Sequence, residues 1–335
     1  MDTVRIKESE LRQITLFIID TKIIFHPVIS PNGFPDFSNH QGIKNILILD
    51  RNILTPMIGL LKTGHLKDDH IRKIIGSLMV WTQFNNISVT SGLALSEYAY
   101  HKGREAEANL ERDLFLKAFN NYHPNIWLEI ALGRRKTIEP LTVDASEEFS
   151  YNKEYDHYKM HYLEMLKIAQ YYFDQSLSLE GKITRFHRWV YDNLILCGYT
   201  ISYLALLTGG RINTFNKTKN FDQVISQCKN QAWDLSYLSL WSTLYDNEPE
   251  SNANYLFATL DKGLKQIFML THNEAIDLHS EIFGSNVGGR INQSMHDIFK
   301  PRPLPKMSIE HIDEMIGTEF SQLEQTYNST TRQEI

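Results

Sequence analysis

The sequence of 335 residues predicts an α/β fold, in which a central parallel sheet is flanked by helices and interrupted by a large helical insertion. Two short apolar runs, residues 46–49 and 255–260, support the sheet because each is nearly free of polar residues. Such a run is typical of a strand buried on both faces, as in the centre of a parallel sheet. Each run leads directly into an aspartate, Asp50 or Asp261. Helical patterns fill most of the chain between them.

Composition limits the class of protein. The hydrophobic fraction of 42% is ample for a packed core, and the net charge of -6 does not by itself indicate a nucleic-acid binder. The two cysteines, Cys197 and Cys228, form no CxxC pair, which argues against a disulfide framework or a cysteine-built zinc site. The charged start at Met1–Lys7 and the absence of a membrane-length apolar run predict a cytoplasmic protein that makes no membrane contact.

The N-terminal part is expected to alternate strands, loops and helices. Residues 14–29 are rich in β-branched and aromatic residues, which predicts one or two strands, and residues 30–42 form a loop. The strand at residues 44–49 precedes a helix at 53–63 that ends near Gly64, a residue suited to a helix C-cap. Apolar residues at helical spacing predict a second helix at residues 68–84.

Glu97 is the next residue of interest. Residues 87–90 are β-branched and predict a short strand, and Ser91 is a candidate N-cap of the helix that follows. Glu97 lies in this helix among Ala94, Leu95 and Ala99. A carboxylate on an apolar helix face costs free energy unless a partner or a metal compensates it. A solvated outer face is the alternative interpretation of Glu97.

Helices dominate the rest of the chain. Residues 104–229 are expected to be mostly helical, with a loop at 133–152, and a further helix at 227–245 carries Asp234 among large apolar neighbours. A final helix is expected at 309–326. The tyrosines of residues 158–172 have the spacing of helix packing, which favours a core role over a base-stacking surface.

Four acids therefore stand out: Asp50, Glu97, Asp234 and Asp261. Asp50 could simply cap the next helix, since Asp is a favoured N-cap residue. However, ligands of open α/β sheets lie at the carboxyl ends of the strands, where both Asp50 and Asp261 are expected. Helices beginning at that edge could bring Glu97 and Asp234 over it. Several carboxylates this close require a compensating cation, and oxygen ligands favour Mg²⁺ or Mn²⁺.

The sequence resembles the PIN-domain family within the PIN-like metal-dependent nucleases. The resemblance covers roughly residues 44–104 and 228–270 and is carried by four fragments in the same order. These are Ile46-Leu47-Ile48-Leu49-Asp50-Arg51-Asn52, the stretch from Ile87-Ser88-Val89-Thr90-Ser91 to Leu95-Ser96-Glu97, Ala232-Trp233-Asp234-Leu235, and Phe257-Ala258-Thr259-Leu260-Asp261-Lys262. The long helical segment between Glu97 and Asp234 departs from compact PIN domains.

The resemblance implies a ribonuclease in which Asp50, Glu97, Asp234 and Asp261 are catalytic and hold Mg²⁺ or Mn²⁺. Asn52 and Thr259 would hold the carboxylates in place. The implied core comprises residues 1–104 and 228–300, with a helical insertion at 105–227 and a C-terminal extension at 301–335. The expected partners are an RNA substrate and, for a toxin or defence effector, an antitoxin or another protein; a homo-oligomer is a further expectation.

Two other function classes compete with a ribonuclease. The first is a catalytically inactive PIN-like scaffold whose helical insertion binds a protein partner. The second, a DNA or flap nuclease of the same superfamily, is the lesser alternative. Metal-dependent cleavage of RNA or DNA separates these hypotheses.

Several other motifs carry less weight. His157 and His161 have a metal-ligand spacing on a helix but lack the glutamate of a zinc protease, and His296-Asp297 stands alone. The basic clusters 134–136 and 182–188 could bind phosphates but are more often solvated faces. The glycine pairs at 209–210 and 288–289 lack the spacing of a phosphate loop.

Overall fold

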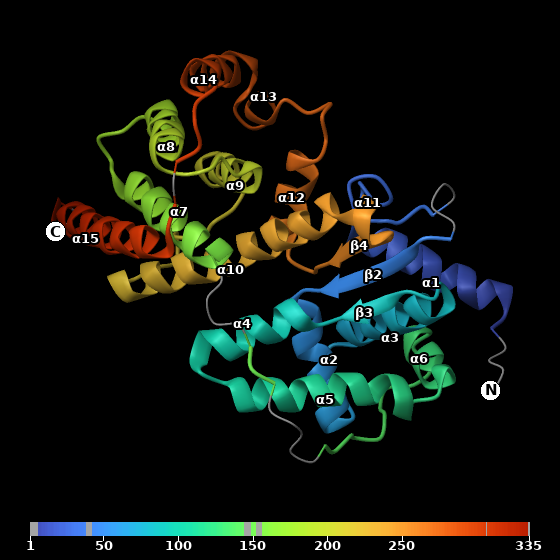
Figure 1. Ribbon diagram of the computed structural model, residues 1–335. Helices are drawn as coiled ribbons and strands as arrows, with labels where there is room; N and C mark the ends of the chain where they lie inside the picture. Colours follow the sequence, from blue (N-terminus) through green and yellow to red (C-terminus); the bar gives the residue numbers. More distant parts are fainter. Residues whose placement is uncertain (1–5, 38–41, 144–148, 152–155, 306, 334–335) are drawn as a thin grey trace. The chain divides into compact units, whose positions relative to one another are not determined.

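The computed structural model describes residues 6–37, 42–143, 149–151, 156–305 and 307–333 (Figure 1). The chain divides into two compact units, each made of two segments. The first unit comprises Met1–Lys153 and Trp241–Lys265, and the second comprises Glu154–Leu240 and Gln266–Ile335. The boundary expected at residue 105 therefore lies inside the first unit, and residues 266–300, expected in the core, belong to the second.

The first unit contains the sheet, so the predicted α/β class is confirmed at this level. The described strands are β1 (Ile24–Phe25), β2 (Lys44–Leu49), β3 (Ser88–Thr90) and β4 (Ala253–Ala258). They lie in the order β1-β4-β2-β3. Strand β2 pairs in parallel with both β3 and β4, whereas β1 pairs antiparallel with β4, so the sheet is mixed.

The register of this sheet aligns the carboxyl ends of its parallel strands. Leu49 of β2 lies opposite Ala258 of β4, and Ile48 lies opposite Thr90 of β3. The residues that follow each strand therefore emerge at one edge. The last three side chains of both β2 and β4 are almost completely buried, as the apolar runs predict.

Helices surround the sheet of the first unit (Figure 1). Their bounds are α1 (Glu8–Thr21), α2 (Arg51–Thr63), α3 (Asp69–Phe84), α4 (Gly92–Lys102), α5 (Glu105–Asn121), α6 (Pro124–Ala131) and α11 (Glu248–Ser251). Helix α3 packs on α6 and α1, while α5 packs on α4 and α2. Gly64 ends α2 with a φ of 73°, the left-handed conformation expected of a glycine C-cap.

Residues 14–21 are helical, which corrects the prediction of strands over residues 14–29. The apolar residues Ile14 and Ile18 are four apart and fully buried on one side of α1, and Glu10 closes a capping box at the start of this helix. Helical spacing and capping outweigh the β propensity of the isoleucines here. Within residues 14–29, only Ile24–Phe25 form a strand.

The second unit consists of helices joined by loops, and its described residues include no strand. Its helices are α7 (Asp156–Phe173), α8 (Leu179–Asn193), α9 (Gly198–Thr208), α13 (Leu278–Phe283), α14 (Ser285–Ile298) and α15 (Ile309–Gln333). Helices α10 (Phe221–Asp246) and α12 (Lys262–Thr271) cross from one unit to the other. Helix α15 packs along α7, and α14 packs on α13 and α8. Within the described residues, no helix is both long and apolar enough for a membrane span.

Candidate functional site

Asp50 is the buried centre of the candidate site. It follows β2 directly, and its backbone N–H donates to the carbonyl of Ala258 at 2.9 Å, which extends the ladder between β2 and β4. Only 3% of Asp50 is exposed. Although Asp50 occupies the N-cap position of α2, its side chain makes no capping hydrogen bond. A capping role therefore does not explain this aspartate.

Two side chains hold the Asp50 carboxylate instead. The Thr259 hydroxyl donates to Asp50 Oδ2 at 2.6 Å, and the Asn52 amide donates to the same oxygen. The Asn52 carbonyl accepts from the backbone N–H of Leu260 at 2.9 Å, so Asn52 ties α2 to the segment after β4. The two residues predicted to support the carboxylates thus both contact Asp50.

Glu97 and Asp261 contribute charge to this edge of the sheet. The pKa of Asp50 is raised to about 7, mainly by burial and also by the charges of Glu97 and Asp261, while the Thr259 hydrogen bond lowers it. Glu97 is half-buried on α4, and Asp261 is exposed where the chain enters α12. The Asp261 carboxylate accepts from the backbone N–H of Leu264 at 2.8 Å. Glu97 and Asp261 therefore each lie within electrostatic reach of Asp50.

Asp234 has a different location. It lies on the part of α10 that belongs to the second unit, where its carboxylate accepts from the Gln231 side chain at 2.9 Å. Its charge raises the pKa of Tyr203, another residue of that unit, in addition to the larger effect of burial. The first unit thus assembles three of the four predicted acids, Asp50, Glu97 and Asp261.

The fit to a cation rests on charge and burial. An ionised Asp50 beside two further carboxylates needs a compensating positive charge. In the part of the chain that the structure describes, no three His, Cys, Asp or Glu side chains are grouped closely enough to enclose a metal ion. Mg²⁺ does not require such a group, because it keeps several waters and binds one or two carboxylates together with substrate phosphates. The three acids therefore fit an open site of this kind.

A cluster around Tyr98 joins the helices that carry Asp50 and Glu97. The Arg51 guanidinium lies over the Tyr98 ring, 4.1 Å from its centroid, and donates to buried Glu111 of α5 at 2.6 Å. Arg104 donates to the Tyr98 hydroxyl at 3.1 Å. Our sequence analysis missed this cluster. The signal was present, since Arg51 and Tyr98 are the immediate chain neighbours of Asp50 and Glu97.

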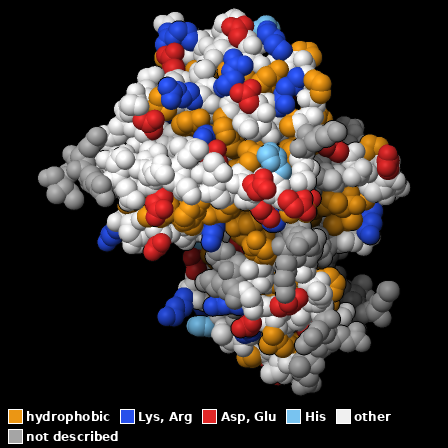
Figure 2. All heavy atoms as spheres, turned by 60° about the vertical axis from the view of Figure 1, so that its left-hand side comes forward, with side chains coloured by type: hydrophobic (Ala, Val, Ile, Leu, Met, Phe, Trp, Pro, Cys, Tyr) orange, Lys and Arg blue, Asp and Glu red, His pale blue; other side chains and the backbone are white. Residues whose placement is uncertain are grey.

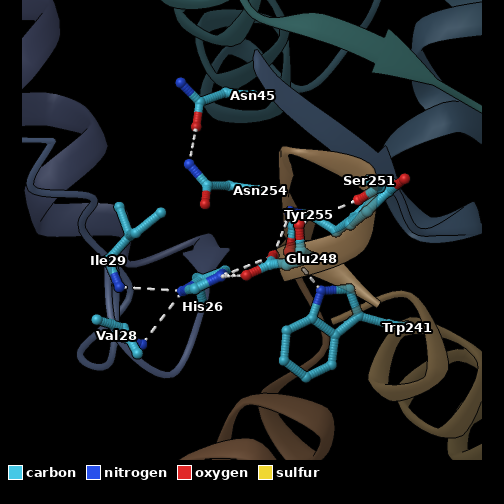
Figure 3. Close-up of polar contacts among 9 residues, drawn as sticks. All are labelled: His26, Val28, Ile29, Asn45, Trp241, Glu248, Ser251, Asn254 and Tyr255. Carbon is cyan, nitrogen blue, oxygen red and sulfur yellow. Dashed lines mark hydrogen bonds and ion pairs between the residues drawn. The ribbon is translucent and has the colours of Figure 1, made fainter. Parts of the chain in front are cut away.

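The opposite end of the sheet holds a second polar network (Figure 3). His26 accepts two backbone N–H bonds at Nδ1, from Val28 at 3.1 Å and Ile29 at 3.0 Å. Its Nε2 therefore carries the hydrogen and donates to Glu248 at 2.9 Å. Because both ring nitrogens are engaged, His26 is placed to hold α11 against the strands rather than to transfer protons.

Three further hydrogen bonds hold the sheet at this end. Glu248 accepts from the Tyr255 N–H at 2.5 Å, and Trp241 donates to the Tyr255 carbonyl at 2.6 Å. Asn254 donates to Asn45 across the starts of β4 and β2 at 2.9 Å (Figure 3). These bonds fix β4 at the end away from Asp50.

The competing histidine motifs do not form sites. His161 is fully buried, and its two ring nitrogens bond Glu164 at 2.7 Å and Ser239 at 2.6 Å, so it has no lone pair to share with His157 in a metal site. His296 and Asp297 form an exposed pair 3.6 Å apart.

The basic clusters are partly neutralised. Arg134 pairs with Glu10 at 2.6 Å and Arg135 with Glu129 at 2.8 Å. Lys182 donates to the carbonyl of Tyr172 at 2.7 Å. On the face shown in Figure 2, lysine and arginine side chains lie among acidic and hydrophobic ones. Arg134 and Arg135 are therefore each paired with an acid.

No protein-family model, curated protein or solved structure matches the chain.

Proposed function

We propose that the first unit is a PIN-like nuclease domain that cleaves RNA with the help of Mg²⁺ or Mn²⁺. The observation that carries this proposal is the burial of Asp50 at the carboxyl end of β2, beside the end of β4, where the charges of Glu97 and Asp261 act on its carboxylate. A protein does not ordinarily retain a buried carboxylate beside two others without use for it, because each charge raises the cost of the next. Perturbed carboxylates at the carboxyl ends of parallel strands are typical of functional sites.

Each residue has a proposed task in this site. Asp50 would bind the cation directly, and Glu97 and Asp261 would bind it directly or through water. Thr259 and Asn52 keep Asp50 in one orientation through their hydrogen bonds to Oδ2. When bound, the cation would supply the charge that activates water and stabilises a displacement at phosphorus. Asp234 stays a sequence-based prediction outside this three-acid site.

Cleavage of single-stranded RNA oligonucleotides in Mn²⁺ tests the proposal. We expect Asp50→Asn to lower the rate on the order of 10²–10³-fold, the usual effect of removing one preorganised electrostatic group. Asp20→Asn, a change at an exposed aspartate of α1, is the matched control and should retain activity. Uncleaved RNA at high protein and Mn²⁺ concentrations would contradict the proposal. DNA oligonucleotides in the same assay identify the preferred nucleic acid.

One observation favours a second candidate, a catalytically inactive scaffold. The acids of the described residues are not already gathered as a set of three metal ligands. In that case the helical second unit would serve a protein partner, such as an antitoxin. A folded intact chain that neither binds Mn²⁺ nor cleaves RNA or DNA would support this candidate over the nuclease.

A further inference from the structure

His187 of α8 is a buried imidazole without hydrogen bonds. It is 0% exposed, and neither Nδ1 nor Nε2 has a hydrogen-bond partner. Buried polar groups in native proteins nearly always have a hydrogen-bond partner. An imidazole left in this state needs an explanation such as a bound ion or water.

His279 of α13 faces the same region of the second unit. It is 2% exposed, and its ring centroid lies 5.7 Å from that of His187. Its Nδ1 lies 2.7 Å from the Asn292 carbonyl oxygen, which can only accept, so Nδ1 carries the hydrogen. Its Nε2 consequently has a free lone pair, and this atom also lacks a partner.

Asn292 is itself held by a carboxylate. Its amide donates to the two oxygens of Asp277, at 2.7 and 2.9 Å. A histidine whose second nitrogen is oriented by a carbonyl or carboxylate is the usual arrangement around a metal-binding imidazole. The chain Asp277–Asn292–His279 therefore fixes both the tautomer and the direction of the Nε2 lone pair.

We propose that His187 and His279 bind one transition-metal cation of the Zn²⁺ class between their rings. With metal–nitrogen distances of about 2.0–2.1 Å, two imidazoles that share an ion have centroids about 5–6 Å apart. The observed 5.7 Å falls in this interval. One nitrogen of each ring would bind the ion, and the other His187 nitrogen would carry the ring hydrogen.

The chemistry of the ligands selects the ion. Imidazole suits Zn²⁺, Cu²⁺ and Ni²⁺, whereas Mg²⁺ prefers oxygen. Since the described residues contain no group of three protein ligands, water would complete the coordination shell. This site is separate from the carboxylates around Asp50 and does not depend on the proposed nuclease activity.

Zn²⁺ binding by the full chain tests the inference. The chain is freed of metal with a chelator and titrated with Zn²⁺ against a chromophoric competitor, with excess Mg²⁺ present and in the Asp50→Asn background to suppress binding at the carboxylates. We expect one Zn²⁺ per chain. The change Asn292→Leu should weaken binding about 10–100-fold, as is usual for a residue that orients a metal ligand. His296→Ala, at an exposed histidine, is the matched control and should bind Zn²⁺ normally.

Two further measurements keep the inference testable if a variant folds poorly. Co²⁺ added to the unaltered chain should give the visible absorption of a nitrogen-ligated ion. His187→Phe should abolish binding of Zn²⁺ and its effect on the melting temperature. Failure of the unaltered chain to bind Zn²⁺, or equal binding by His187→Phe, would overturn the inference.

Discussion

Thr259 donates its hydroxyl hydrogen to Asp50 at 2.6 Å, directly beyond the last paired residues of β4 and β2. The same Thr259 oxygen accepts from the backbone N–H of Asp261 at 3.0 Å. One side chain thus orients the buried carboxylate and fixes the start of the segment that carries the next acid. This relationship makes Thr259 the residue through which the Asp50 pKa can be altered without removing a carboxylate.

We predict that Thr259→Val raises the pKa of Asp50 further. The hydrogen bond lowers this pKa, and a hydrogen bond to a charged group contributes about 1.5–3 kcal/mol, so its loss should raise the pKa by about 1–2 units. Carboxyl NMR titration measures the change, and Mn²⁺ binding should then require higher pH. Thr259→Ser retains the hydroxyl and should restore the original titration. An unchanged pKa in Thr259→Val would contradict the assignment.

Removing the charge of Asp50 should stabilise the metal-free protein at high pH. The folded pKa of about 7 exceeds the ordinary 3.8, so the folded state retains a proton that the unfolded state loses between these values. The free energy of unfolding therefore falls as pH rises from about 4 to about 7 and then levels off. Asp50→Asn should abolish this fall and gain up to about 4 kcal/mol at pH 8.

Urea denaturation at pH 4 and pH 8, in a chelator, measures that difference. The Asp20→Asn variant should follow the unaltered chain at both values. Destabilisation of Asp50→Asn at pH 8 would instead show that the Asp50 carboxylate has a structural role.

Changes at the neighbouring acids should move the Asp50 pKa in the opposite direction from Thr259→Val. Glu97 and Asp261 both raise this pKa, so Glu97→Gln and Asp261→Asn should each lower it. Mn²⁺ binding to either variant should weaken, even though Asp50 ionises more readily. Carboxyl NMR and the electron paramagnetic resonance of free Mn²⁺ provide the two measurements. If a variant lowers the pKa of Asp50 but keeps its full Mn²⁺ affinity, the replaced acid is not a ligand of the cation.

The Arg51–Tyr98 contact should matter for stability and metal affinity together. Tyr98→Leu removes the surface under the Arg51 guanidinium and the acceptor of Arg104. We expect a loss of about 1–2 kcal/mol, as for a partly buried cation–π contact and one hydrogen bond. Mn²⁺ affinity should fall because the helices that carry Asp50 and Glu97 lose a shared contact. Tyr98→Phe keeps the ring and should lose less of both.

The His26–Glu248 pair should contribute stability without affecting the site chemistry. Glu248→Ala leaves a buried imidazole N–H and the Tyr255 N–H without their acceptor, at a cost of about 2–3 kcal/mol. Glu250→Ala, two residues away and exposed, is the matched control. Chemical denaturation measures the cost. A loss as small as that of Glu250→Ala would show that the pair is not a structural anchor.

The sequence was most informative where local patterns determine structure. The apolar runs before Asp50 and Asp261 required burial, and their shared direction placed both acids at one edge. The order of the four acids along the chain, compared with that of PIN domains, also indicated Glu97 as a candidate site residue. Residues 14–21 were assigned wrongly because β-branched residues suit both a strand and a buried helix face, and the spacing of Ile14 and Ile18 was the better signal.

Long-range pairs could not be read from the sequence. His26 and Glu248 are 222 residues apart, and Arg51 and Glu111 are 60 apart. No local propensity specifies such a partner, since it depends on which helices and strands pack together. The sequence also does not show that Asp234 belongs to the second unit. Asp234 has the same apolar setting as the other acids, yet its helix crosses from one unit to the other.

The pairing of β2 with β4 also has a consequence for biosynthesis. Thr259 follows Asp50 by 209 residues, and all of them must be made before this hydrogen bond can form. Closing so long a loop carries an entropic cost, which slows the parallel pairing. A nascent chain made only as far as Leu240 has Asp50 and Glu97 but neither β4 nor Asp261. Asp50 therefore gains its Thr259 partner only after the first segment of the second unit has been made.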